Sequence, residues 1–175
     1  MPCRQPFRAF TLPELLITLS VLGIILGFAV PSLHTLLQDS RRSSERHLMH
    51  ASLNYARGMA LQTQSVVSLC SGQSSCNDSR HWRERILIFV DRNGNGLLDE
   101  DEQLLKVVDI DPRHRWHWSN FRQQPHMSFS ANGMTDSLNG TFTLCDEEQA
   151  THAIVINITG RARYSAELDH ERCRG

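Results

Sequence analysis

Lysine is almost absent from this sequence of 175 residues. Lys106 is the only one, so 17 of the 18 basic residues are arginines, and 19 acidic residues bring the formal net charge to −1. This balance excludes a strongly basic nucleic-acid-binding protein at the level of the whole chain. Arginine binds phosphates and carboxylates in a bidentate manner and stacks on flat rings, so a binding surface would have to be a local patch.

Enzyme signatures are missing as well. The sequence contains no Gly-x-Ser-x-Gly nucleophile elbow and no glycine loop that would hold a phosphate. It also lacks a Cys-x-x-Cys pair, which disfavours a zinc site built from cysteines. His114 and His117 have no two further well-placed partners, so we expect no zinc site there. We therefore predict that the protein is not an enzyme and carries no cofactor.

A long apolar run is present, however. It extends from Ala9 to Pro31 and contains one charged residue, Glu14. Its length matches the roughly 20 residues of a bilayer-spanning helix. A carboxylate inside a membrane costs several kcal/mol, which indicates that Glu14 has a function. Arg4 and Arg8 precede the run and would keep the N-terminus in the cytoplasm.

A secretory signal peptide has its small-residue cleavage site after the apolar run, whereas here the candidate cleavage site lies at the beginning of the run. Residues 9–16 read Ala-Phe-Thr-Leu-Pro-Glu-Leu-Leu, which resembles the class III signal of type IV pilins and type II secretion pseudopilins. The resemblance implies that prepilin peptidase cuts between Ala9 and Phe10 and methylates the new amine. The family usually has Gly at Ala9 and a large aliphatic residue at Pro13. Pro13 would fall in the first turn of the mature helix, where its missing N–H breaks no hydrogen bond.

The resemblance also implies a role for Glu14 in a filament. Its carboxylate would pair with the positive N-terminus of a neighbouring Phe10, so that neither charge stays unpaired in an apolar core. Pro31 agrees with this interpretation, because pilins commonly carry a helix-bending proline at this distance from the mature start. The alternative is an ordinary membrane anchor with an acidic residue at its edge.

Beyond Pro31, apolar residues recur at steps of three and four, with arginines on much of the other face, as in an amphipathic helix. We expect one long helix from Phe10 to about Thr63. The predicted organisation is a cleaved leader (1–9), a transmembrane and filament-core helix (10–35), an amphipathic stem (36–65) and a globular domain (66–175).

The globular domain shows short strand patterns separated by Gly, Asn, Asp and Pro clusters. No segment between them is long enough for a crossover helix, so the sheet should be antiparallel. We therefore predict an α+β protein with the type IV pilin fold, in which the long helix packs on the sheet. The expected strands are 66–70, 86–90, 104–108, 115–118, 126–129, 141–145, 153–158 and 161–164.

Residues 54–61, Asn-Tyr-Ala-Arg-Gly-Met-Ala-Leu, and residues 66–70, Val-Val-Ser-Leu-Cys, resemble the FimT/GspH branch of pilin-like proteins. In that branch an Ala-Arg-rich helix end leads into a strand that ends in Leu-Cys. The resemblance covers essentially the whole mature chain and is tightest at its two ends.

Four cysteines remain after the predicted cleavage, in a domain that the anchor would place outside the cytoplasm. Disulfides are usual there. Of the three pairings we favour Cys70–Cys76, which closes a small turn, and Cys145–Cys173, which would hold the C-terminus to the sheet. A four-cysteine zinc site is the alternative.

Residues 91–102 match the EF-hand calcium loop at its oxygen ligands, its turn glycine and its terminal Glu. The flanking segments have strand patterns where an EF-hand has helices, so an Asp-Asn-Gly-rich hairpin loop is the favoured interpretation. The candidate calcium ligands are Asp91, Asn93, Asn95, Asp99 and Glu102.

Residues 111–122 interleave basic and aromatic side chains. Strand alternation would place Trp116 and Trp118 on one face and Arg115 and His117 on the other. We favour packing of both tryptophans under the stem helix. The alternative is an edge that stacks and binds a nucleic acid strand. Arg113, Arg115 and Arg122 are expected to help the DNA-binding pair Arg161 and Arg163, described below.

Residues 160–163, Gly-Arg-Ala-Arg, carry the strongest functional signal. In a strand, Arg161 and Arg163 project from one face about 6.6 Å apart, which suits backbone phosphates. The element resembles one in FimT-type minor pilins that captures DNA during natural transformation, which implies DNA binding by these two residues. A solvated strand neutralised by Glu167, Asp169 and Glu171 is the alternative.

The prediction is thus a minor type IV pilin that binds double-stranded DNA without sequence specificity. Its rival is a FimU- or GspH-like subunit that primes pilus or type II secretion filament assembly and binds only other pilins. Both hypotheses expect prepilin peptidase and other pilin subunits as partners. Both place the chain first in the inner membrane, as a single-pass protein with a periplasmic domain, and then in the pilus at the cell surface.

Overall fold

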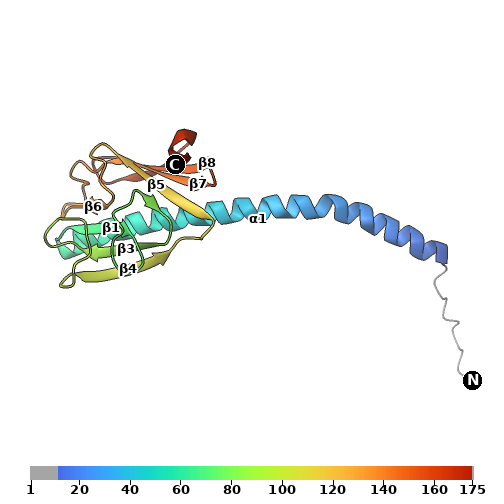
Figure 1. Ribbon diagram of the computed structural model, residues 1–175, viewed down its shortest axis with the longest axis horizontal. Coiled ribbons are helices and arrows are strands. Elements are labelled where there is room, and N and C mark those ends of the chain that lie inside the picture. Colours follow the sequence, from blue (N-terminus) through green and yellow to red (C-terminus); the bar gives the residue numbers. More distant parts are fainter. Residues whose placement is uncertain (1–11, 175) are drawn as a thin grey trace, which may run out of the picture. The chain divides into compact units, whose positions relative to one another are not determined.

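The computed structural model describes residues 12–174, except for the side chains of residues 28, 29, 31 and 34. The predicted cleavage site at Ala9 and Phe10 lies outside the described residues. The described chain begins with one helix, α1, which extends over 52 residues from Leu12 to Thr63 (Figure 1). Its end at Thr63 agrees with the end predicted from the sequence.

The chain divides into two compact units, Met1–Arg41 and Arg42–Gly175. In the first unit, the described part of α1 exposes its large apolar side chains, such as Leu15, Leu19 and Leu22. Glu14 lies in the first turn of the helix. No helix within the described residues combines the length and the apolarity needed to cross a membrane. The membrane-spanning role of residues 10–35, which begin outside the described part, stays a prediction.

The second unit contains two antiparallel sheets. The first has the order β4-β3-β1-β6, and the second has the order β2-β5-β7-β8-β9. This arrangement confirms the expected antiparallel topology. The first sheet comprises β1 (Val67–Ser71), β3 (Arg85–Val90), β4 (Gln103–Asp109) and β6 (Met127–Phe129). The second comprises β2 (His81–Trp82), β5 (His114–Asn120), β7 (Gly140–Asp146), β8 (Gln149–Ile156) and β9 (Ala162–Ser165).

All eight predicted strands have a counterpart, shifted by a few residues at most at their ends. The structure adds β2, which pairs with β5, and a 3-10 helix, η1 (His170–Cys173). Two residues are too few to show an alternating pattern, so β2 left no signal in the sequence.

The core lies where the second half of α1 meets both sheets (Figure 1). From α1 it receives Met49, Leu53, Ala56 and Ala60, which recur at helical spacing. From β5 it receives Trp116 and Trp118, and Trp118 stacks on Phe142 with ring centroids 4.2 Å apart. The Trp118 indole donates its N–H to the carbonyl of His126 at 3.0 Å, so its one polar group is satisfied.

Both tryptophans of β5 are thus fully buried. The favoured interpretation, packing under the stem helix, is confirmed. A nucleic-acid edge built on Trp116 and Trp118 is wrong, because neither ring has a free face on which a base could stack.

Both predicted disulfides are present. Cys70 is bonded to Cys76 and Cys145 to Cys173, with Cα–Cα distances of 5.6 and 5.5 Å. The second bond ties η1 to β7. The four-cysteine zinc site is therefore wrong, because all four sulfurs are used.

The loop of residues 91–102 connects β3 to β4 and is flanked by strands, as the favoured hairpin interpretation requires. Asp91 is buried and accepts hydrogen bonds from Ser68 Oγ and from the N–H groups of Gly94 and Gly96, at 2.6, 2.7 and 2.9 Å. Asp99 likewise accepts from the side-chain amides of Asn93 and Asn95. The acidic oxygens of the loop thus accept the loop's own N–H groups.

Candidate nucleic-acid interface

The β8–β9 hairpin positions the arginine pair. Ile156 pairs with Ala162, and the turn between them is closed by the Gly160 N–H, which donates to Asn157 O at 2.9 Å. The Asn157 side chain accepts the Arg161 N–H at 2.9 Å and so orders the residue that enters β9. Arg161 directly precedes β9, which begins one position later than the sequence predicted.

Gly160 has a φ of +73°, a conformation that side chains rarely adopt. A Cβ at this position would also overlap the carbonyl oxygen of Gly133. That same carbonyl accepts a hydrogen bond from Arg57 Nε of α1 at 3.0 Å. The glycine of the Gly-Arg-Ala-Arg element is therefore required where the hairpin turn approaches the loop before β7.

Alternate residues of β9 point to opposite faces. Tyr164 faces α1, where its ring lies 4.9 Å from the His50 ring and 4.6 Å from the guanidinium carbon of Arg46. Strand alternation therefore places Arg161 and Arg163 on the other face, away from the helix. Both are exposed, and neither guanidinium has a hydrogen bond or ion pair with another described residue.

The three acidic residues that follow do not pair with these arginines within the described part of the chain. Asp169 instead accepts a hydrogen bond from Arg172 Nε at 2.9 Å and caps η1 by accepting the Glu171 N–H. β9 is moreover an edge strand, since it pairs only with β8 in the five-stranded sheet. Arg161 and Arg163 thus form an open, positively charged edge.

Arg122 lies at the same end of this sheet. It follows β5, and the register runs from Asn120 through Gly140 and Ile156 to Ala162. Three strand spacings separate β5 from β9, which corresponds to about 14 Å. Arg122 is exposed and lines a cavity of about 400 Å³.

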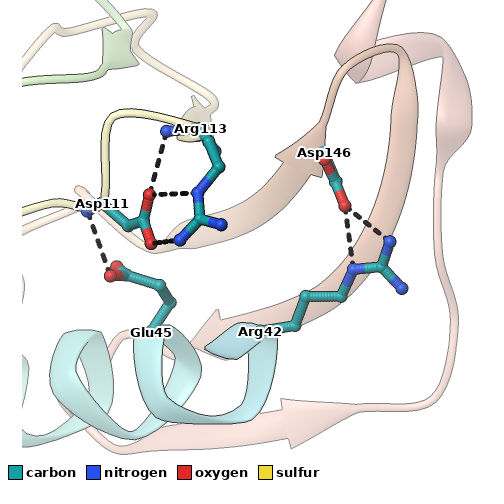
Figure 2. Close-up of polar contacts among 5 residues, drawn as sticks. All are labelled: Arg42, Glu45, Asp111, Arg113 and Asp146. Carbon is teal, nitrogen blue, oxygen red and sulfur yellow. Dashed lines mark hydrogen bonds and ion pairs between the residues drawn. The ribbon is translucent and has the colours of Figure 1, made fainter. Parts of the chain in front are cut away.

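The other predicted helpers lie at the opposite end of the sheet. Arg115 pairs in register with Cys145 and donates to the carbonyl oxygen of Cys173, next to the second disulfide. Arg113 binds Asp111 through Nε and Nη2 at 3.0 and 2.5 Å (Figure 2). The structure therefore separates Arg113 and Arg115 from the Arg161–Arg163 edge, although the sequence grouped them as helpers.

A second basic cluster was not predicted from the sequence. His81 of β2 faces His117 of β5, with their Nδ1 atoms 3.4 Å apart. Burial, followed by the positive charges of His81, Arg80, Arg172 and Arg115, lowers the pKa of His117 to about 4. Burial, followed by Arg115, Arg83 and Arg80, also lowers the pKa of His81. The signal was weak, because His81 lies in a strand of two residues.

Comparisons with known proteins agree with this architecture. The family model of the type II transport protein GspH matches residues 46–160, and that of the prokaryotic N-terminal methylation motif matches residues 4–30. No curated protein sequence matches the chain.

Two crystal forms of the type IV minor pilin FimU of Pseudomonas aeruginosa (strain PAO1) are similar in structure. One is 19% identical and covers 73% of this chain and 96% of the FimU chain, with a TM-score of 0.54. The other is 18% identical and covers 75% and 94%, also with a TM-score of 0.54. At this identity the similarity shows the fold, an N-terminal helix packed on antiparallel sheets.

The GspH family model spans more than half of the chain, and the methylation motif includes the predicted cleavage site at Ala9 and Phe10. The sequence-based resemblance is thereby confirmed. This chain belongs to the GspH family, within the group of type IV minor pilins and pseudopilins.

Proposed function

We propose that this protein is a minor type IV pilin that binds double-stranded DNA without sequence specificity for uptake in natural transformation. The observation that carries the proposal is the pair Arg161 and Arg163, which is exposed on one face of an edge and lacks acidic partners among the described residues. Guanidiniums that are not neutralised by the protein are free to bind backbone phosphates, which supply most sequence-independent affinity for DNA.

The expected affinity follows from the charge. The whole chain has a net charge of −1, so attraction must come from the local edge. Two arginines, with Arg122 as a third at the same end of the sheet, neutralise few phosphates. We expect a dissociation constant on the order of micromolar at moderate salt and a shallow dependence on salt concentration. Phosphate contacts position a protein without reading bases, so random and natural sequences should bind equally.

The test is a gel-shift titration with the full-length chain in detergent. Replacing Arg161 and Arg163 together by Gln keeps the strand polar and removes two charges, so DNA retardation and transformation should both be lost. The double variant Arg92→Gln, Arg174→Gln removes the same charge from two other exposed sites and should retain both activities. Pilus formation should be unchanged in both variants.

The second candidate function is priming of pilus or type II secretion filament assembly without DNA binding. The match of residues 46–160 to the GspH family favours it, because this family also includes pseudopilins. If the Arg161→Gln, Arg163→Gln variant loses pili while DNA retardation persists, the assembly function is correct and the DNA-binding proposal is wrong.

A further inference from the structure

Three metal-ligating side chains from distant parts of the sequence meet beside α1. Glu45 belongs to α1, Asp111 to the connection between β4 and β5, and His114 is the first residue of β5. One ligand atom of each lies within 4.8 Å of those of the other two. Glu45 is 9% exposed and His114 is 6% exposed, so this is a largely buried group.

His114 has an unmet bonding requirement. Its Nδ1 atom is buried and has no hydrogen-bond partner among the described residues. A buried polar atom without a partner costs free energy, and a native structure normally satisfies it with a protein group, a water molecule or an ion. The imidazole lies next to two carboxylates, so a cation is the ligand that all three groups could share.

Glu45 points to the same conclusion. The Asp111 N–H donates to Glu45 Oε1 at 3.0 Å, and no other described residue donates to this carboxylate (Figure 2). Arg42, which precedes Glu45 by three residues on α1, binds Asp146 Oδ2 at 2.9 and 2.6 Å (Figure 2).

Arg113 holds Asp111 in a fixed orientation. Its backbone N–H and its Nε both donate to Oδ1, at 3.1 and 3.0 Å, and its Nη2 donates to Oδ2 (Figure 2). Oδ1 accepts two of these bonds and Oδ2 accepts one, so Oδ2 retains a lone pair that can bind a cation. Outer partners of this kind are usual for a carboxylate that binds a metal, because they fix its direction.

We propose that Glu45, Asp111 and His114 form a binding site for a divalent transition metal of the zinc class, with a water molecule as the fourth ligand. Two carboxylates and one imidazole are a ligand set that Zn²⁺ accepts, and three protein ligands leave a position for water. Zn–N and Zn–O bonds of about 2.0–2.2 Å in a tetrahedron place ligand atoms roughly 3.3–3.6 Å apart. The present ligand atoms lie within 4.8 Å of one another, so side-chain shifts of roughly 1.5 Å at most would close the site.

The site would join α1 to the start of β5 independently of the disulfides and of the arginine edge. Its function is structural, because a metal that binds the folded chain and not the unfolded one stabilises the fold. The sequence pattern around His114 did not reveal this group, because one of its members, Glu45, lies on α1, far earlier in the chain.

The experiment uses the full-length chain in detergent, treated with a chelator and titrated with Zn²⁺ alone. We expect one saturable Zn²⁺ per chain by calorimetry and a rise in melting temperature of several degrees. Glu45→Gln and His114→Gln should each weaken Zn²⁺ binding at least tenfold. His117→Gln is the matched control and should bind as the unchanged chain does, although His117 belongs to the other close histidine pair.

X-ray absorption at the zinc edge tests the proposal on the unchanged chain, without relying on the folding of a variant. One imidazole with oxygen ligands is the expected signature. Two imidazoles would assign the metal to His81 and His117 and overturn the proposal. Absence of saturable binding would overturn it too, as would Zn²⁺ affinity that survives in both Glu45→Gln and His114→Gln.

Discussion

His117 is a histidine whose surroundings keep it neutral well below its ordinary pKa. Burial and the charges of His81, Arg80, Arg172 and Arg115 lower its pKa from 6.5 to about 4. In the unfolded chain neither burial nor these charges act on His117. Between pH 6.5 and 4 the unfolded state therefore binds more protons than the folded state. Stability is therefore retained above pH 6.5 and lost as the pH falls toward 4.

We predict that the melting temperature of the chain falls as the pH is lowered from 6.5 to 4, and that His117→Gln reduces this fall. The reduction should be modest, because His117 is only half-buried and the pKa values of His81 and His126 are also lowered. Thermal melts at half-unit pH steps measure it. An identical pH dependence in the two proteins would contradict the assigned charge cluster.

Two arginines show that similar sequence surroundings can lead to different environments in the fold. Arg115 and Arg163 are alike in sequence, since each alternates with aromatic or apolar residues in a strand pattern. In the structure, Arg115 is bound to the Cys173 carbonyl, whereas Arg163 is exposed on an edge strand. The partners of a charged residue depend on segments far away in sequence, so spacing alone could not separate the two.

The β3–β4 loop shows how an element can carry a metal-binding motif and use it for hydrogen bonds. Asp91 accepts three hydrogen bonds in a buried position, from Ser68 and from the N–H groups of Gly94 and Gly96. These donors hold the loop closed between two strands. Calcium at Asp91, Asn93, Asn95, Asp99 and Glu102 stays an open alternative.

We predict that Asp91→Ala destabilises the chain by about 3 kcal/mol, because it leaves two backbone N–H groups without an acceptor and leaves the Ser68 hydroxyl with Ser128 Oγ alone as its partner. Glu100→Ala, which removes an exposed carboxylate from the same loop, should change stability by less than about 0.5 kcal/mol. Urea unfolding measures both. We further expect millimolar Ca²⁺ to leave the melting temperature unchanged; a rise that Asp91→Ala abolishes would instead establish a calcium site.

At the scale of the whole molecule, the N-terminal motif and the family membership concern assembly of the chain into a filament. The methylation motif spans residues 4–30 and includes Glu14, which lies in the first turn of α1. Family membership implies processing by prepilin peptidase and contact with other pilin subunits. Within a filament, the Glu14 carboxylate would neutralise the N-terminal amine of a neighbouring Phe10.

We predict that Glu14→Ala leaves cleavage intact but reduces incorporation into filaments, because the amine loses its counter-charge. Mass spectrometry should find an N-methylated Phe10 terminus in the unchanged chain and in the variant. Immunoblots of sheared filaments should show the subunit only in the former. An intact Met1 terminus in cells that contain the peptidase would refute the processing.

Much of this protein follows from the sequence alone, because its signals are local. Helix periodicity, strand alternation and turn residues depend on neighbours within a few positions, and they predicted α1 and the eight longer strands. The cleavage motif and the Gly-Arg-Ala-Arg element are each contiguous in the chain, so the order of the residues is enough to recognise them. The disulfide pairing was also predicted, since few pairings were available.

Only the tertiary structure decided which side chains meet. It decided between the two interpretations of Trp116 and Trp118 by burying both in the core, and it paired His81 with His117 through a strand too short to predict. It also brought Glu45 to within ligand distance of Asp111 and His114. These contacts join residues tens of positions apart, and their formation depends on how two sheets pack on one helix, which no local pattern encodes.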